Sequence, residues 1–166
     1  MDNFDDEIRS LATTVLERCR ALDWKAATAE SCTGGLIAGA LTEIAGSSDV
    51  VDRGFVTYSN EAKMQMLGVP AETLTAHGAV SEQTARAMAL GALANSDAGV
   101  SIAVTGVAGP GGGSAKKPVG LVHFAAATPD GIIAEHRVFE GDRGAVRHQT
   151  VLHALKMMLA LTDAAS

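Results

Sequence analysis

Apolar residues recur along this chain with two different periods, which predict alternating helices and strands. Ile8, Leu11, Val15 and Leu16 are spaced as on one face of a helix, whereas short, nearly continuous apolar runs are typical of buried strands. We expect helices over residues 5–22, 36–44, 61–67, from 82 onward and over 142–161. We expect strands over residues 25–29, 55–58, 100–104, 121–127 and 132–139.

Polar residues at the edges of these segments support the boundaries. Ser81 can cap the helix that starts at residue 82, and Ser59 or Asn60 can cap the helix over 61–67. Asp130-Gly131 between two predicted strands is a hairpin signal. Strands that alternate with helices and then give way to a hairpin indicate an α/β fold with at least one antiparallel strand.

We therefore expect a single domain over residues 1–166, built as a three-layer α/β/α sandwich around a mixed, mostly parallel sheet of about five strands. Ligands of such sheets bind at the carboxyl ends of the strands. Ser31, Tyr58 and Thr105 each end or follow a predicted strand. Three separate segments should therefore meet at one edge of the sheet.

Composition and charge exclude several function classes. Hydrophobic residues make up 47% and charged residues 19% of the 166 residues, which is enough for a core. A net charge of −6 argues against nucleic acid as a partner, and every apolar stretch is shorter than the roughly 20 residues of a membrane span. The acidic start over residues 1–7 does not look like a signal peptide, and two cysteines make no disulfide framework. We expect a cytoplasmic protein.

Residues 28–35, Thr-Ala-Glu-Ser-Cys-Thr-Gly-Gly, form the most informative motif. They join a predicted strand to a predicted helix, where free backbone N–H groups can bind an anion or a developing oxyanion. Ser31 is either a helix cap or a nucleophile, which needs a base. Cys32 is either a reactive thiol at a helix start or a small hydrophobe in the core.

Lys63 is a candidate base for Ser31. It lies in the helix that follows the strand ending at Tyr58, and it can act as a base only if burial or a nearby cation lowers its pKa. A solvated surface lysine is the alternative. Tyr58, the only tyrosine, can position Lys63 or the substrate, or can be a core residue with a bonded hydroxyl.

A glycine-rich loop and an arginine pair are candidate anion sites. Residues 105–114 carry five glycines between Thr105 and Ser114, and such loops can curl their N–H groups around an anion. Arg143 and Arg147 are four residues apart at the start of the last helix and can face one way. They form either a phosphate clamp or a pair of surface charges. The five histidines show no metal-binding spacing, and we expect no metal and no cofactor.

Taken together, residues 28–35, 53–63, 77–81, 105–114, 117–120 and 141–143 resemble the CinA C-terminal domain family, and the similarity spans roughly residues 7–161. The resemblance implies hydrolysis of the carboxamide of nicotinamide mononucleotide, in pyridine nucleotide salvage, by a Ser31/Lys63 dyad with Tyr58 beside it. It implies that the substrate is bound by further residues of these motifs: Cys32, Thr33, Gly34, Gly35, Thr105, Gly106, Gly109, Gly112, Arg143 and Arg147.

Longer members of this family carry an additional N-terminal domain, whose activity we expect to be absent from a chain that begins at the amidase domain. The expected partner is a small nucleotide, with neither nucleic acid nor membrane, and we expect a homo-oligomer because small α/β enzymes often self-associate. Two other functions stay open from the sequence: a nucleotide-binding module without catalysis, and a purely structural partner domain associated with competence or damage responses.

Overall fold

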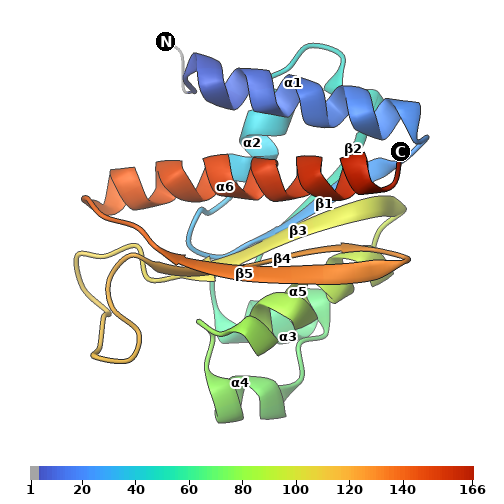
Figure 1. The fold of residues 1–166 in the computed structure, drawn as a ribbon. Coiled ribbons are helices and arrows are strands. Elements are labelled where there is room, and N and C mark those ends of the chain that lie inside the picture. The colour runs from blue at the N-terminus through green and yellow to red at the C-terminus, as the bar shows by residue number, and fades with distance from the viewer. Residues whose placement is uncertain (1–3) are drawn as a thin grey trace.

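The computed structural model describes residues 4–166 and confirms the predicted fold class: a five-stranded sheet lies between two layers of helices (Figure 1). The helices are α1 (Asp6–Ala21), α2 (Leu36–Thr42), α3 (Asn60–Leu67), α4 (Ala71–His77), α5 (Glu82–Ala94) and α6 (Arg143–Ala164), with a short 3-10 helix, η1 (Ser47–Asp49). The strands are β1 (Lys25–Glu30), β2 (Val51–Val56), β3 (Ala98–Gly106), β4 (Leu121–Thr128) and β5 (Gly131–Val138).

The sheet is mixed, with the strand order β2-β1-β3-β4-β5. β1 pairs in parallel with β2 and β3, and β4 runs antiparallel to both β3 and β5. Four of the five strands thus point the same way, as a mostly parallel sheet requires. Glu30 pairs with Val56 of β2 and with Val104 of β3. The carboxyl ends of these three strands are therefore level and form one edge of the sheet, here called the carboxyl rim.

Successive side chains of each strand point to opposite faces of the sheet, so a hydrophobic core forms on each face. α1, α2 and α6 cover one face, and α3, α4 and α5 lie on the other (Figure 1). Ile102 of β3 packs in the first core with Leu16 and Leu155, whereas its neighbour Ala103 packs in the second with Met88. Each large buried side chain stabilises the fold by about 1.5–3 kcal/mol relative to exposure.

Side-chain caps begin four of the helices. Ser59 accepts a hydrogen bond from Ala62 N at 3.0 Å, and Ser81 accepts one from Thr84 N at 3.2 Å. Asp5 caps α1 and Asp142 caps α6 in the same way. Ser59 is therefore the cap of α3, and Asn60 is its first helical residue. Because α3 carries Lys63, the cap that sets the start of this helix also sets the backbone position of the lysine.

Three elements differ from the sequence prediction, and one of them is the short 3-10 helix η1, which was not predicted. α4 was not predicted, and none of its residues is buried, so its sequence has no apolar period to detect. β2 spans Val51–Val56 rather than residues 55–58. It is an edge strand, and its outer part carries the polar residues Asp52 and Arg53. Thr57 and Tyr58 lie beyond its end, where their carbonyl groups are free to bind other partners.

Among residues 4–166, no helix combines the length and the apolar character needed to cross a bilayer. The same residues hold no group of three or more His, Cys, Asp or Glu side chains placed to bind a metal ion. Of the acidic start of the chain, residues 1–7, the structure describes residues 4–7, and residues 1–3 lie outside the described part.

Candidate active site

Ser31 and Lys63 meet at the carboxyl rim. Ser31 follows the last residue of β1, and its backbone N–H donates to Val104 O at 3.1 Å, which extends the pairing with β3 by one residue. Lys63 reaches the rim from α3, and its Nζ donates to Ser31 Oγ at 3.0 Å. The lysine is 1% exposed and the serine 8% exposed. The two residues that the sequence proposes as a pair are thus in direct contact and almost out of water.

The surroundings of Lys63 favour its neutral form. Its other acceptors are the carbonyl oxygens of Thr57 at 2.8 Å and of Tyr58 at 3.4 Å. None of these three oxygens carries a full negative charge. Removal from water without a carboxylate partner disfavours the ammonium ion, and burial accordingly lowers the pKa of Lys63. An amine in this state can accept a proton from the hydroxyl it touches.

Cys32 lies in the core instead. Its side chain is 6% exposed and belongs to the cluster of buried apolar residues on the face covered by α1 and α6. Burial raises the pKa of the Cys32 thiol to about 11, so it is protonated near neutral pH. A buried, protonated thiol is a poor nucleophile. Of the two adjacent candidates, the structure brings Lys63 to Ser31.

Glu30 holds the turn between β1 and α2, a role that the sequence analysis missed. The carboxylate is 1% exposed and accepts hydrogen bonds from Thr33 Oγ1 at 2.6 Å, Ile37 N at 2.8 Å and Ala38 N at 3.0 Å. It caps a helix whose own N-cap residue, Gly35, has no side chain. The only sequence signal was an acidic residue at the end of an apolar strand.

The capping by Glu30 changes where an oxyanion could bind. Leu36 N donates to Thr33 O at 3.1 Å, so the first three N–H groups of α2 all have partners within the protein. In the preceding turn, the N–H groups of Thr33 and Gly35 have no hydrogen-bond partner among residues 4–166. Gly34 and Gly35 have φ angles of 60° and 110°, a region that favours glycine. Free donors therefore lie in the turn and not at the helix end.

Tyr58 and the two arginines connect the rim to α6. Tyr58 is 64% exposed, and its hydroxyl accepts a hydrogen bond from Arg143 Nη2 at 3.4 Å. Arg143 Nη1 also donates to Gly109 O at 2.9 Å. Arg147, one turn later, donates from Nε to Cys32 O at 3.2 Å and from Nη2 to Thr33 O at 3.1 Å. Arg143 thus lies over the mouth of the site, while Arg147 contacts the backbone of the turn.

The remaining predicted residues surround this centre. Thr105 donates its hydroxyl to Ala79 O at 2.8 Å. Gly106 packs so tightly that an added Cβ would lie 2.8 Å from Leu121 O. Gly109 and Gly112 both have positive φ angles, of 83° and 84°. A cavity of about 470 Å³ lies beside this loop and is lined by Ala108, Pro110, Val119, Gly141, Asp142, Arg143 and Gly144.

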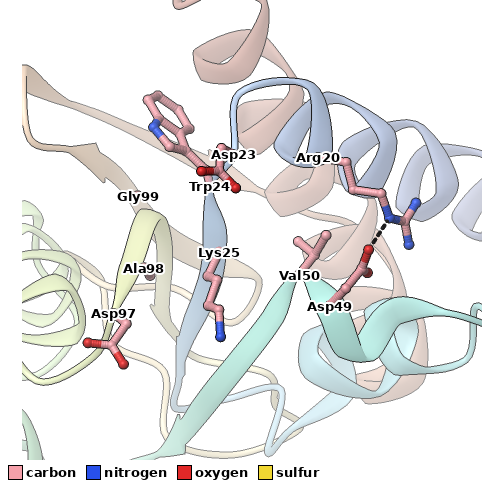
Figure 2. Close-up of a pocket in the computed structure, with 9 residues that line it drawn as sticks. All are labelled: Arg20, Asp23, Trp24, Lys25, Asp49, Val50, Asp97, Ala98 and Gly99. Carbon is pink, nitrogen blue, oxygen red and sulfur yellow. Dashed lines mark hydrogen bonds and ion pairs between the residues drawn. The ribbon is translucent and has the colours of Figure 1, made fainter.

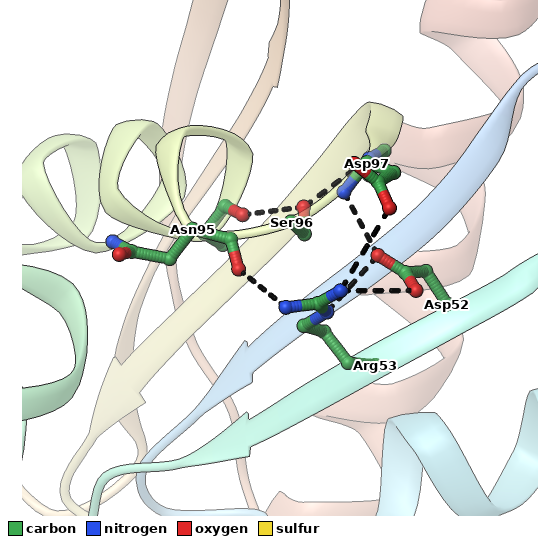
Figure 3. A network of polar contacts seen from close by, with 7 residues as sticks. Asp52, Arg53, Asn95, Ser96 and Asp97 are labelled. Atoms are coloured by element: carbon green, nitrogen blue, oxygen red, sulfur yellow. Dashed lines mark hydrogen bonds and ion pairs between the residues drawn. The ribbon is translucent and has the colours of Figure 1, made fainter.

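A larger cavity, of about 650 Å³, lies at the opposite edge of the sheet, where the parallel strands begin (Figure 2). Its charged side chains include Lys25 and a hydrogen-bonded pair, Arg20 and Asp49, whose Nε–Oδ2 distance is 2.8 Å. Beside it, Asp52 and Arg53 form a network with the backbone of residues 95–97 (Figure 3). The N–H of Asp97 donates to Asp52 at 2.8 Å and is the main cause of that carboxyl's lowered pKa.

The fold and site define an α/β protein with a buried serine–lysine pair at the carboxyl ends of its parallel strands. The chain belongs to the CinA family: the model of the CinA C-terminal domain matches residues 8–162. A crystal structure of the competence/damage inducible protein CihA from Agrobacterium tumefaciens has a TM-score of 0.94 and 56% identity, covering 97% of this chain and 99% of that one.

Two curated relatives differ in length. The nicotinamide-nucleotide amidohydrolase PncC of Escherichia coli K12 is 50% identical over 155 residues, which is 93% of this chain and 94% of that protein. A putative competence-damage inducible protein of Caldicellulosiruptor bescii is 54% identical over 134 residues, which is 81% of this chain but 33% of that protein. The family domain therefore occurs both as nearly a whole protein and as one part of a longer one.

Proposed function

We propose that this protein is an amidohydrolase that converts nicotinamide mononucleotide to nicotinate mononucleotide and ammonia. The observation that carries the proposal is the 3.0 Å contact between Ser31 Oγ and the Nζ of a buried Lys63, whose partners within the described part of the chain include no carboxylate. This pair fits acyl transfer to a serine. The substrate is inferred from a relative: PncC of Escherichia coli, which is 50% identical over almost its full length, is a nicotinamide-nucleotide amidohydrolase.

The reaction would proceed in two stages. Neutral Lys63 takes the proton of Ser31 as Oγ attacks the carboxamide carbon, and the carbonyl oxygen becomes an oxyanion. The N–H groups of Thr33 and Gly35, free in the turn, are its proposed donors. Lys63 then gives its proton to the departing nitrogen, and ammonia leaves. Water, deprotonated by Lys63, hydrolyses the ester to release the carboxylate product and restore Ser31.

The phosphate of the substrate is proposed to bind near Arg143. This exposed guanidinium lines the cavity of about 470 Å³ beside the glycine-rich loop. It also contacts Tyr58, whose backbone carbonyl holds Lys63. A nucleotide with its phosphate at Arg143 and its carboxamide at Ser31 would therefore lie between the loop and the turn. Tyr58 would then line the path between the two.

The decisive experiment is an ammonia-release assay with purified protein and nicotinamide mononucleotide, run beside nicotinamide and NAD as controls. We expect release from the mononucleotide and much less from nicotinamide, which lacks the phosphate. Binding of the mononucleotide without ammonia release would favour a non-catalytic nucleotide-binding module. Failure to bind any pyridine nucleotide would favour a structural domain. Either result would contradict the proposed activity.

We further propose that the protein acts in the cytoplasm, as a homo-oligomer, in pyridine nucleotide salvage. A nucleotide substrate, which is an intracellular metabolite, supports the location and the pathway. The size and fold class of the chain support self-association, because small α/β enzymes often form oligomers. Light scattering at several protein concentrations tests the oligomer, and a monomeric mass throughout would contradict it.

A further inference from the structure

We propose that Arg147 is a positioning residue, which acts on the reaction through the backbone of residues 31–35 and not by binding the phosphate of the substrate. This inference rests on the proposed amidohydrolase function. Arg147 is half-buried, and two of its guanidinium nitrogens already donate to protein carbonyl groups, Cys32 O at 3.2 Å and Thr33 O at 3.1 Å. The arginine fork is suited to holding two neighbouring acceptors at once.

One of these two bonds, to Cys32 O, fixes the orientation of a proposed oxyanion donor, the N–H of Thr33. The other, to Thr33 O, holds the peptide whose N–H, on Gly34, donates to Ser31 O. A trans peptide is planar, and its C=O and N–H bonds point in opposite directions. The carbonyl of Cys32 is turned toward Arg147 on α6, so the N–H of Thr33, in the same peptide, points away from α6. Lys63 approaches Ser31 from α3, which lies on the opposite face of the sheet from α6 (Figure 1). The unpaired N–H of Thr33, a residue that is fully buried before substrate binds, therefore points toward the face of the sheet from which Lys63 comes.

Glu30 holds the same turn from the strand side. Its carboxylate accepts from Thr33 Oγ1 and from the N–H groups of Ile37 and Ala38. Arg147 holds the carbonyl groups, and Glu30 holds the side chain of Thr33 and the helix that follows. A cation on the carbonyl end of a peptide also polarises the group and strengthens its N–H as a donor. The turn is thus fixed in place before substrate arrives, as electrostatic stabilisation of an oxyanion requires.

Arg143 provides a contrast within the same helix. It lies one turn before Arg147, is exposed, and lines the cavity of about 470 Å³. Its partners are Gly109 O and the hydroxyl of Tyr58, both at the mouth of the site. A nucleotide phosphate could reach Arg143 without breaking the turn. The same phosphate at Arg147 would compete with the carbonyl groups of Cys32 and Thr33. The two arginines therefore have separate tasks.

Steady-state kinetics on matched variants separates these tasks. We expect Arg147→Met to lower kcat by about 100-fold or more, the usual effect of losing one oxyanion donor, with KM changed by less than about threefold. Arg143→Met, the matched control, should instead raise KM by roughly tenfold or more. Arg147→Lys keeps the charge but cannot hold two carbonyl groups in the fork, so it should recover only part of kcat.

Binding in a background without turnover gives a second readout. In Ser31→Ala protein, calorimetric titration with nicotinamide mononucleotide should give the same Kd with Arg147 or Met at position 147, and a weaker Kd when Arg143 is replaced by Met. Thermal unfolding checks that each variant is folded. If Arg147→Met does not fold, Arg147→Lys is measured in the same assays, and its kcat, KM and Kd test the inference instead.

Two results would overturn the inference alone: an Arg147 variant with raised KM or Kd and unchanged kcat, or one with no change in either constant. If the unaltered protein releases no ammonia from the mononucleotide, the proposed function is wrong, and the inference that rests on it is wrong as well. The assay of the unaltered protein therefore separates the two failures.

Discussion

The two ends of the parallel strands differ in the burial of their polar side chains. At the carboxyl rim, Ser31, Lys63 and Glu30 are almost fully out of water, and each has defined partners at short distance. At the amino ends, the larger cavity of about 650 Å³ is lined by charges such as those of Arg20 and Asp49, which remain exposed and pair with one another (Figure 2). Cavity size is therefore not what marks the proposed site. It is marked by the buried serine–lysine pair, in which burial lowers the pKa of Lys63.

This comparison predicts that the largest effect comes from the buried pair. Ser31→Ala and Lys63→Met should each reduce ammonia release by roughly 10⁴-fold, because neither the nucleophile nor its base works alone. The double variant should be no worse than either single variant, since the two residues act as a unit. Circular dichroism should confirm a native fold. Substantial activity in either single variant would remove the dyad from the mechanism.

Activity should also depend on pH through Lys63. Burial lowers the pKa of this lysine, and only its neutral form can take the proton of Ser31. Below that pKa, kcat/KM should therefore rise about tenfold per pH unit and then level off at a pH below the ordinary lysine value of about 10.4. Lys63→Arg, which stays charged, should be inactive at every pH. A profile that is flat from acid to neutral pH would contradict a lysine base.

A smaller effect should follow from moving the helix that carries the lysine. α3 packs against α5 at Gly91, where an added Cβ would lie 2.0 Å from Leu67 O. Gly91→Ala must push the end of α3 away, at a cost of about 1–3 kcal/mol in stability. The displaced Lys63 should reduce kcat by tenfold or more. Gly131→Ala is the control, because nothing lies within 4 Å of its added Cβ. Urea unfolding and the ammonia assay measure both effects.

Replacing the adjacent thiol should change stability more than activity. Cys32→Ala removes a buried sulfur from the core and should reduce the free energy of unfolding by about 0.5–3 kcal/mol. Ammonia release should stay within an order of magnitude of the unaltered protein, because the thiol packs in the core and Ser31 is the group that contacts Lys63. Loss of activity in this variant, with Ser31→Ala still active, would transfer the nucleophile to Cys32.

The smallest effect is expected at the opposite edge of the sheet. Arg53→Met removes the exposed guanidinium that joins Asp52 and Asn95 O (Figure 3). An ion pair in which the guanidinium is exposed contributes about 1 kcal/mol or less to stability. The kinetic constants should be unchanged. A marked fall in kcat/KM would mean that the amino end of the sheet takes part in the reaction, and the contrast between the two ends would fail.

Much of the fold could be predicted because its signals are local and regular. The core side chains of α1, α5 and α6 recur at helical spacing, and the buried strands β3 and β4 are short apolar runs. α4 could not be predicted, since a helix without buried residues leaves no period. β2 was placed too late along the chain, because an edge strand with a solvent-facing side tolerates polar residues such as Asp52.

The site could be predicted only in part. Strand ends place Ser31, Tyr58 and Thr105 near one edge, and the family resemblance pairs Ser31 with Lys63. The partners of Glu30 and Arg147 could not be predicted, because they depend on how residues up to 115 positions apart meet in space. A carboxylate that caps a helix from a neighbouring strand has no fixed sequence spacing. An arginine that binds backbone oxygens leaves no trace in the sequence of the turn.

The burial of both cysteines has a consequence for handling and for physiology. Burial raises the pKa of Cys19 and of Cys32 to about 11, so both thiols are protonated at neutral pH. Peroxide and alkylating reagents attack the thiolate, and access to both sulfurs is blocked. The protein should therefore need no reducing agent during purification. Ser31, the proposed nucleophile, would keep working in a cell under oxidative stress, when enzymes that depend on a reactive cysteine are inactivated.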